Sequence, residues 1–128
     1  PGARSFIKEC DDQGLKLALV TGTARSEVQK ILPKDLIERF DVIISGSDVK
    51  HGKPHPEPYL KAIKKLKVGR GEAIVVENAP FGITSAAKAG LFCVAIETSL
   101  PKGYLKEADT IIHDYKGLKN ILKRYKIS

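Results

Sequence analysis

The sequence predicts an α/β fold in which helices cover both faces of a parallel sheet. Short apolar segments rich in β-branched residues alternate along the chain with segments of helical periodicity. Strands that alternate with helices pair in parallel through right-handed crossovers. Small or polar residues directly follow the apolar segments, and the 128 residues suffice for one domain. We therefore expect a single three-layer α/β/α domain over residues 1–128.

Glycines, prolines and polar turns divide the first part of the chain into elements. Apolar residues recur at helical spacing up to Gly14, which is placed as a helix stop, and an apolar run of strand length follows. Pro33 divides the next helical pattern in two, and a β-branched run ends before Gly46. The expected elements are a helix over 3–13, a strand over 15–20, helices over 24–32 and 33–39, and a strand over 41–45.

The second part of the chain continues the alternation. A loop with glycine and proline breaks leads into an amphipathic helix, and Gly69 and Gly71 turn the chain into the apolar run before Glu77. A helix of small residues follows and is closed by Gly90. The expected elements are helix 57–66, strand 73–76, helix 83–89, strand 92–96, a short helix over 100–107, strand 110–112 and an amphipathic helix over 117–125.

Composition narrows the classes of protein and partner. No apolar run approaches the ~20 residues of a membrane span, so no membrane partner is expected. Cys10 and Cys93 have neither CxxC spacing nor a neighbouring His, which predicts reduced, non-catalytic thiols in a cytoplasmic protein. The net charge of +7 lies mainly on two helical faces with few aromatic residues, which favours solvated faces over a nucleic-acid interface.

The turn Thr21-Gly22-Thr23 follows the first predicted strand. Its backbone N–H groups could point at an anion near a helix N-terminus. In a second interpretation, Thr21 or Thr23 caps the helix that follows. Taken by itself, the turn favours the cap.

Lys53 lies in a loop that three prolines stiffen and one glycine lets turn, Gly52-Lys53-Pro54-His55-Pro56-Glu57-Pro58. A rigid loop fixes the direction of a lysine, as a point charge for a phosphoryl group requires. Alternatively, the prolines only start the next helix and Lys53 is solvated.

Glu77 and Asn78 follow a buried strand and offer hard oxygen donors. Mg²⁺ is commonly held by one or two carboxylates, water and substrate phosphate. Alternatively, Glu77 interacts favourably with the N-terminal dipole of the next helix.

Together, these motifs resemble the haloacid dehalogenase (HAD) superfamily, in particular the branch that contains β-phosphoglucomutase and phosphoglycolate phosphatase. The strand ending in Thr21 is similar to the second motif of the family, and the Gly-Lys-Pro-x-Pro loop at Lys53 to the third. The hydrophobic strand with Glu77-Asn78, Gly82 and an Ala-rich helix is similar to the fourth. The resemblance runs over nearly the whole chain and implies a Rossmann-like HAD core.

The resemblance implies a magnesium-dependent hydrolase that acts on phosphate monoesters of small phosphorylated metabolites. Thr21 and Lys53 would be catalytic, and the phosphate would bind to Thr21, Gly22, Thr23 and Lys53. Glu77 and Asn78 would hold Mg²⁺ directly or through water. The family commonly has an acid where Asn78 stands, so this departure is expected to weaken the metal site or to shift its role to Glu77.

The first motif of the family, Asp-x-Asp on the first strand, occurs nowhere in the chain. In the family, this motif supplies the nucleophile that forms an aspartyl-phosphate and the acid/base that assists it. The chain is therefore expected to be the C-terminal part of a longer enzyme, without the nucleophile strand and the cap domain, and to be inactive alone.

In the family, the missing strand lies at the centre of the sheet, between the strands that end at Thr21 and Glu77. Unpaired backbone groups would remain in the core without it. We expect the gap to be filled by an N-terminal segment, by a second copy of the chain in a homo-oligomer, or by closure of the two flanking strands on each other.

Two other functions stay open at this stage. A phosphosugar mutase of the β-phosphoglucomutase type would share the core motifs and differ chiefly in the cap. A non-catalytic phosphate- or anion-binding module would keep the pocket and use the basic helical faces for an anionic partner.

Overall fold

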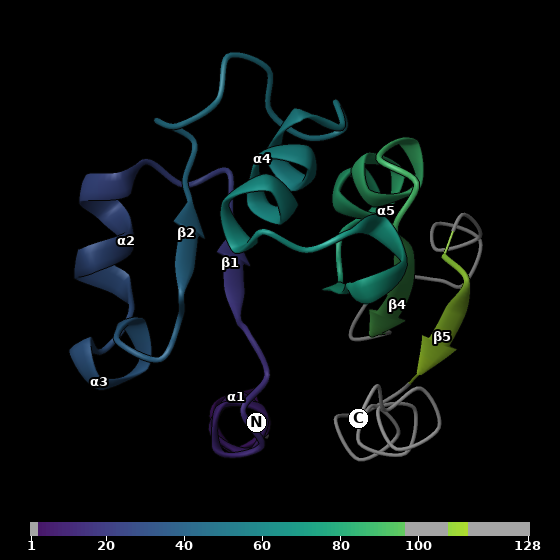
Figure 1. The fold of residues 1–128 in the computed structure, drawn as a ribbon. Coiled ribbons are helices and arrows are strands. Elements are labelled where there is room, and N and C mark those ends of the chain that lie inside the picture. Colours follow the sequence, from purple (N-terminus) through teal and green to yellow (C-terminus); the bar gives the residue numbers. More distant parts are fainter. Residues whose placement is uncertain (1–2, 97–107, 113–128) are drawn as a thin grey trace.

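The computed structural model describes residues 3–96 and 108–112 of the chain (Figure 1). The helices in these residues are α1 (Ala3–Asp12), α2 (Arg25–Ile31), α3 (Lys34–Ile37), α4 (Glu57–Leu66) and α5 (Pro80–Lys88), with a 3-10 turn η1 (Arg70–Glu72). The strands are β1 (Ala18–Val20), β2 (Val42–Ile44), β3 (Ile74–Glu77), β4 (Phe92–Ile96) and β5 (Thr110–Ile112). None of the described helices is long and apolar enough to cross a membrane.

Most element bounds agree with the expected ones, and α4, β4 and β5 match them fully. Strand β1 is shorter than expected, and the N–H of Leu17, just before it, donates to the carboxylate of Asp41 at 2.7 Å. Helix α5 begins earlier, at Pro80, because proline is well suited to the first turn of a helix. The expected helices 100–107 and 117–125 both lie outside the described residues.

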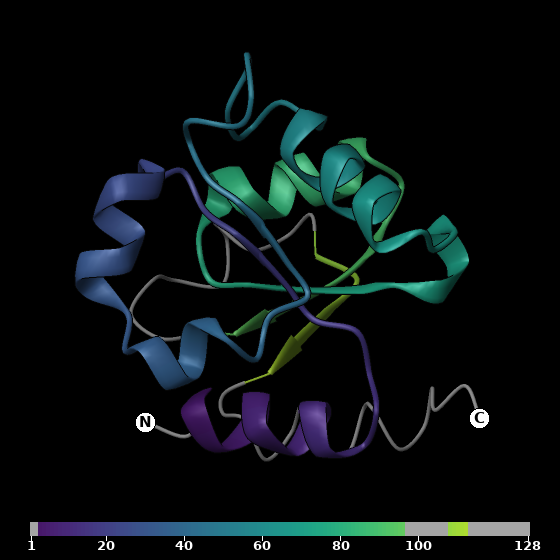
Figure 2. The same ribbon diagram turned by 60° about the vertical axis from the view of Figure 1, so that its left-hand side comes forward.

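All described strands pair in parallel, in two sheets. Strand β1 pairs with β2 in one sheet, and the order in the other is β3-β4-β5. Figure 2 shows α4 and α5 on one side of the strands and α1 on the other. The α/β fold with a parallel sheet between helical layers is thus confirmed.

Two apolar clusters hold the layers together. One lies between the strands and α4 and α5, and it contains Tyr59, Val75, Ile83, Ala86 and Cys93. The other joins α1 to the opposite face through Phe6 and Cys10, which pack with Val94, Ile96 and Ile112. Both cysteines are free and buried. Burial raises the pKa of the Cys93 thiol to about 12, which agrees with the prediction that it is not a nucleophile.

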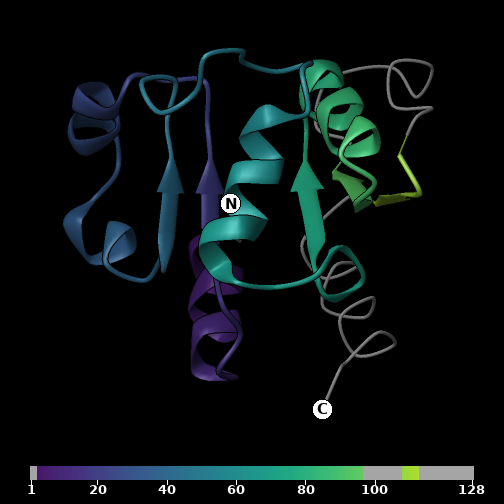
Figure 3. The same cartoon turned by 45° about the horizontal axis from the view of Figure 1, so that its top comes forward.

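Strands β1 and β3 flank a gap in the sheet. They belong to different sheets, and Figure 3 shows them as separate arrows with α4 in front of the interval. Thr21 N–H donates to Ile44 O of β2 at 2.9 Å, so the backbone groups of Ala18 and Val20 point away from β2, toward the gap. On this side, β1 pairs with no other strand of the described residues, so the gap is an open edge of the sheet.

The expectation that the flanking strands close on each other is wrong. The side chain of Lys53 lies between their ends, where its Nζ donates to Val20 O and to the carboxylate of Glu77. A charged, hydrogen-bonded side chain in this position keeps the two strand ends apart. The other two ways of filling the gap, by an N-terminal segment or by a second copy, stay predictions.

Candidate functional site

The candidate site lies at the carboxyl edge of β1 and β3, where three segments of the chain meet. The turn after β1 carries Thr21, the loop before α4 carries Lys53, and β3 ends at Glu77. In open α/β sheets, ligands bind at this edge, beside the crevice where the order of the strands is interrupted. The structure therefore brings together residues that lie more than fifty positions apart in the sequence.

Lys53 is the centre of the site. Its ammonium group donates to Glu77 Oε2 at 2.7 Å and to Val20 O at 3.0 Å, and its side chain is only 17% exposed. The alternative of a solvated lysine is thus wrong. The proline-rich loop that carries Lys53 is anchored from the other side, since the buried Ser85 hydroxyl donates to His55 O at 2.6 Å.

Glu77 receives hydrogen bonds on both carboxylate oxygens. Oε2 accepts from Lys53 and from the Tyr59 hydroxyl, the latter at 2.6 Å. Oε1 accepts from the backbone N–H groups of Asn78 and Ala79, at 3.2 and 3.4 Å. A carboxylate has about four acceptor sites, and all four are occupied here. The contacts with Asn78 and Ala79, just before α5, also partly support the alternative that Glu77 interacts with the N-terminus of this helix.

Gly82 makes room for this carboxylate. A Cβ added at Gly82, in the first turn of α5, would lie 2.0 Å from both Cδ and Oε2 of Glu77. Any other residue at this position would therefore force the Glu77 side chain to shift. The resemblance had marked this glycine only as part of a motif, and its contact with Glu77 gives it a physical role.

Tyr59 is a site residue that the sequence did not reveal. It lies on α4 and is 6% exposed, within the apolar cluster. Burial, and after it the charge of Glu77, raise the pKa of the Tyr59 phenol well above its ordinary value, so the hydroxyl stays a donor. The Lys53 ammonium also lies 5.3 Å from the centre of the Tyr59 ring. An aromatic residue on the apolar face of a helix gives no signal of such contacts.

The donors at the strand end have the right chemistry for Mg²⁺ but form only part of a site. Asn78 is exposed, and its side chain makes no hydrogen bond within the described parts of the chain. Residues 3–96 and 108–112 contain no group of three or more His, Cys, Asp or Glu that could hold a metal ion. Mg²⁺ needs octahedral coordination by oxygen. Glu77 and Asn78 therefore fit this ion as contributors to a larger, partly water-filled shell.

The side chain of Thr21 stabilises the turn Thr21-Gly22-Thr23. Thr21 Oγ1 accepts from the backbone N–H of Thr23 at 3.1 Å. Helix α2 begins after Ala24 and has no side-chain cap, so the interpretation of Thr21 or Thr23 as its N-cap is wrong. Gly22 is exposed, and a Cβ there would have no neighbour within 4 Å, which leaves space beside its backbone.

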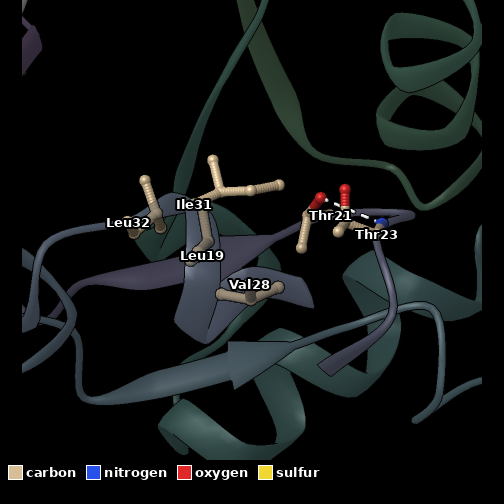
Figure 4. A pocket seen from close by; sticks show the side chains of 6 residues that line it. All are labelled: Leu19, Thr21, Thr23, Val28, Ile31 and Leu32. Carbon is tan, nitrogen blue, oxygen red and sulfur yellow. Dashed lines mark hydrogen bonds between the residues drawn. The ribbon is translucent and has the colours of Figure 1, made fainter. Parts of the chain in front are cut away.

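A small hollow of about 170 Å³ adjoins this turn, between β1 and α2 (Figure 4). It is lined by Leu19, Thr21, Thr23, Val28, Ile31 and Leu32. Apart from the two threonines, its lining is aliphatic. It offers no charged group to a phosphate, which is instead expected on the side of Lys53.

The turn after β2 supports the Thr21 turn from behind. Gly46 N–H donates to Thr23 O at 2.8 Å, and a Cβ at Gly46 would lie 2.2 Å from Gly22 O. Asp48 fixes this second turn, because its Oδ2 accepts from the backbone N–H and the hydroxyl of Ser45, both at 2.7 Å, and from Arg25 at 2.6 Å. These contacts join the two turns into one unit.

Replacing Asp48 by asparagine is expected to reduce the loss of stability in acid. The hydrogen bonds from Ser45, followed by those of Arg25, hold the pKa of Asp48 well below its ordinary value. A lowered pKa contributes stability that is present above about pH 4 and is lost as the pH falls further. Urea unfolding at pH 7 and at about pH 3 should show a smaller difference in Asp48→Asn than in the wild type. An equal reduction in Asp12→Asn, which removes an exposed carboxylate, would contradict this role.

An α/β domain with polar side chains gathered at the carboxyl edge of its strands belongs to the class that binds ligands there. Within this class, the chain belongs to the haloacid dehalogenase-like hydrolases, whose family profile matches residues 1–96.

Individual members of this family are similar to the chain over most of its length. Validoxylamine A 7'-phosphate phosphatase of Streptomyces hygroscopicus subsp. limoneus is 36% identical over 114 residues, which make up 88% of this chain and 54% of that protein. The structure of a HAD phosphatase from Thermococcus onnurineus superposes with a TM-score of 0.85 at 31% identity, covering 95% of this chain and 57% of that one. For β-phosphoglucomutase from Clostridium difficile, the TM-score is 0.78 at 26% identity, with coverage of 98% and 55%.

The chain thus spans about half the length of these relatives. The similarity confirms the family that the three sequence motifs indicated. It also confirms the resemblance to the β-phosphoglucomutase-like branch.

Proposed function

We propose that the protein containing this chain is a cytoplasmic, magnesium-dependent hydrolase of phosphate monoesters of small metabolites. The observation that carries the proposal is the buried pair of Lys53 and Glu77 beside the turn at Thr21, at the carboxyl edge of parallel strands. The phosphatases among the relatives support the same reaction class. The buried free thiols of Cys10 and Cys93 support a reducing compartment.

In this proposal, Lys53 and the Thr21 turn bind the phosphoryl group. An ammonium group has three N–H donors, and within the described residues Lys53 uses two, for Val20 and Glu77. The third is left for a phosphoryl oxygen. The hydroxyl of Thr21 and the backbone around Gly22 and Thr23 would hold the other oxygens, and such donors stabilise the charge that develops during transfer.

Glu77 and Asn78 would hold Mg²⁺ at the end of β3. When bound, the cation supplies positive charge that neutralises phosphoryl oxygens. Because the Glu77 carboxylate already accepts four hydrogen bonds, a cation or a water bound to it would have to displace one of the present donors. Asn78 offers a neutral amide oxygen.

The nucleophile would come from outside this chain. We propose that a strand with an Asp-x-Asp sequence fills the gap between β1 and β3, supplied by an N-terminal segment or by a second copy in a homo-oligomer. Its aspartate would attack phosphorus and displace the alcohol, and water would then hydrolyse the aspartyl-phosphate. The open edge of β1 and the length of the relatives support this arrangement. The 128 residues form one core domain in this proposal, and the cap would lie elsewhere.

The proposal is tested by phosphate release from a panel of small phosphate monoesters. The protein isolated from its source is expected to release phosphate with Mg²⁺ and to stop when the ion is chelated, whereas the purified 128-residue chain alone should release none. Turnover by the chain alone would refute the need for a further strand. Absence of turnover from the isolated protein with every monoester would refute the hydrolase.

A phosphosugar mutase is the second candidate, and the similarity to β-phosphoglucomutase favours it. Both reactions would use the same core residues, so the products decide between them. Conversion of a hexose 1-phosphate into the 6-phosphate without release of phosphate would establish the mutase. An anion-binding module would do neither, and would be stabilised by an oligonucleotide with a steep dependence on salt.

A further inference from the structure

One acid and one amide at the end of β3, Glu77 and Asn78, were expected to hold a metal, but the carboxylate of Glu77 is bonded to protein groups. Its side chain is 9% exposed, and its four acceptor sites are filled by Lys53, Tyr59, Asn78 and Ala79. A metal ion could bind this carboxylate directly only by displacing one of these donors. The shortest contacts, at 2.6 and 2.7 Å, are those from Tyr59 and Lys53 on Oε2.

We propose that Glu77 is the fixed counterion of Lys53 and that Tyr59 is the positioning residue that holds it there. This inference rests on the proposed function for its catalytic meaning. It gives Tyr59 a role that its place in the apolar cluster does not suggest.

The geometry explains why the second donor is needed. A carboxylate bonded to Lys53 alone could rotate and take the ammonium with it, because both side chains are flexible. The Tyr59 hydroxyl reaches the same oxygen from α4, a rigid element, and its ring is fixed by burial. Gly82 lets the carboxylate lie directly against α5. The carboxylate is thus held between two helices, and the remaining N–H of Lys53 keeps a constant direction.

Lysine reactivity measures this arrangement without substrate or metal. The native chain is treated with limiting formaldehyde and cyanoborohydride, and methylation of Lys53 is compared by mass spectrometry with that of Lys64, an exposed lysine on the same helix-loop unit. In the wild type, Lys53 should react about tenfold more slowly than Lys64, because its reaction needs local opening.

Tyr59→Phe removes only the hydroxyl and is expected to raise the relative reactivity of Lys53 roughly three- to tenfold, since the net contribution of a typical hydrogen bond corresponds to a change of about this size. Glu77→Gln should raise it further. Val75→Ala is the matched control, because it loosens the same apolar cluster without touching the pair. An unchanged ratio in a folded Tyr59→Phe variant, or the same rise in Val75→Ala, would overturn the positioning role.

This comparison uses neither metal nor phosphate, so its outcome is independent of the proposed reaction. Absence of phosphate release by the protein isolated from its source would count against the proposed function alone.

Discussion

Gly82→Ala is expected to destabilise the chain by about 2–4 kcal/mol, although alanine is the better helix former. The new Cβ would lie 2.0 Å from Cδ and Oε2 of Glu77, so the carboxylate must move. Its displacement leaves Lys53 and Tyr59, both largely buried, without their shared partner. Breaking a buried ion pair costs about 3–5 kcal/mol, whereas the gain in helix propensity is about 1 kcal/mol. The cost of breaking the ion pair exceeds the gain in helix propensity, so we expect net destabilisation.

Urea unfolding monitored by circular dichroism measures this effect. Gly71→Ala is the control, because Gly71 is exposed and a Cβ there meets nothing within 4 Å. Its stability should lie within about 0.5 kcal/mol of the wild type. If the two variants were equally stable, the carboxylate would have another low-energy position, and the close approach of Gly82 would not be what holds it.

The sequence could predict that Lys53 and the end of β3 lie at the same edge of the sheet, but their ion pair was not predicted. Each residue belongs to a segment with its own local signal, a rigid proline loop and an apolar run that stops at an acid. Parallel strands place their carboxyl ends at one edge, so the two segments had to meet. The gap between β1 and β3 was expected from the family resemblance, because the chain has no Asp-x-Asp, but the position of Lys53 across its end was not expected.

The supporting residues could not be predicted, because their roles depend on distances that local patterns do not contain. Tyr59 looks like a core aromatic, and only the position of α4 brings its hydroxyl to Glu77. Gly46 looks like a strand end, yet its importance comes from the approach of Gly22 O. Asp48 looks like an ordinary loop acid. For Tyr59 and Gly46, and for the contact of Asp48 with Arg25, two segments far apart in the sequence must be placed before the contact exists.

Lys53→Met is expected to destabilise the chain by about 3–5 kcal/mol, a large share of the 5–15 kcal/mol that holds a typical domain together. Methionine keeps the length and the apolar stem but removes the charge and all donors. Glu77 would then stay 9% exposed as a carboxylate without its cation, and Val20 O would lose its hydrogen bond at the edge of the gap. Because the ammonium group is gone, the variant should also lose phosphate binding.

The stability of Lys53→Met is measured by urea unfolding against Lys64→Met, an exposed lysine on α4 whose replacement should change stability by less than about 0.5 kcal/mol. The double variant Lys53→Met/Glu77→Gln then tests the cause. If an uncompensated buried charge is responsible, removing it should restore part of the stability, so the double variant is less destabilised than the sum of the single changes. Strict additivity would mean that the loss comes from the hydrogen bond between Lys53 and Val20 O and not from the pair with Glu77. In that case, Lys53 would stabilise the end of β1, and the carboxylate of Glu77 would not depend on it.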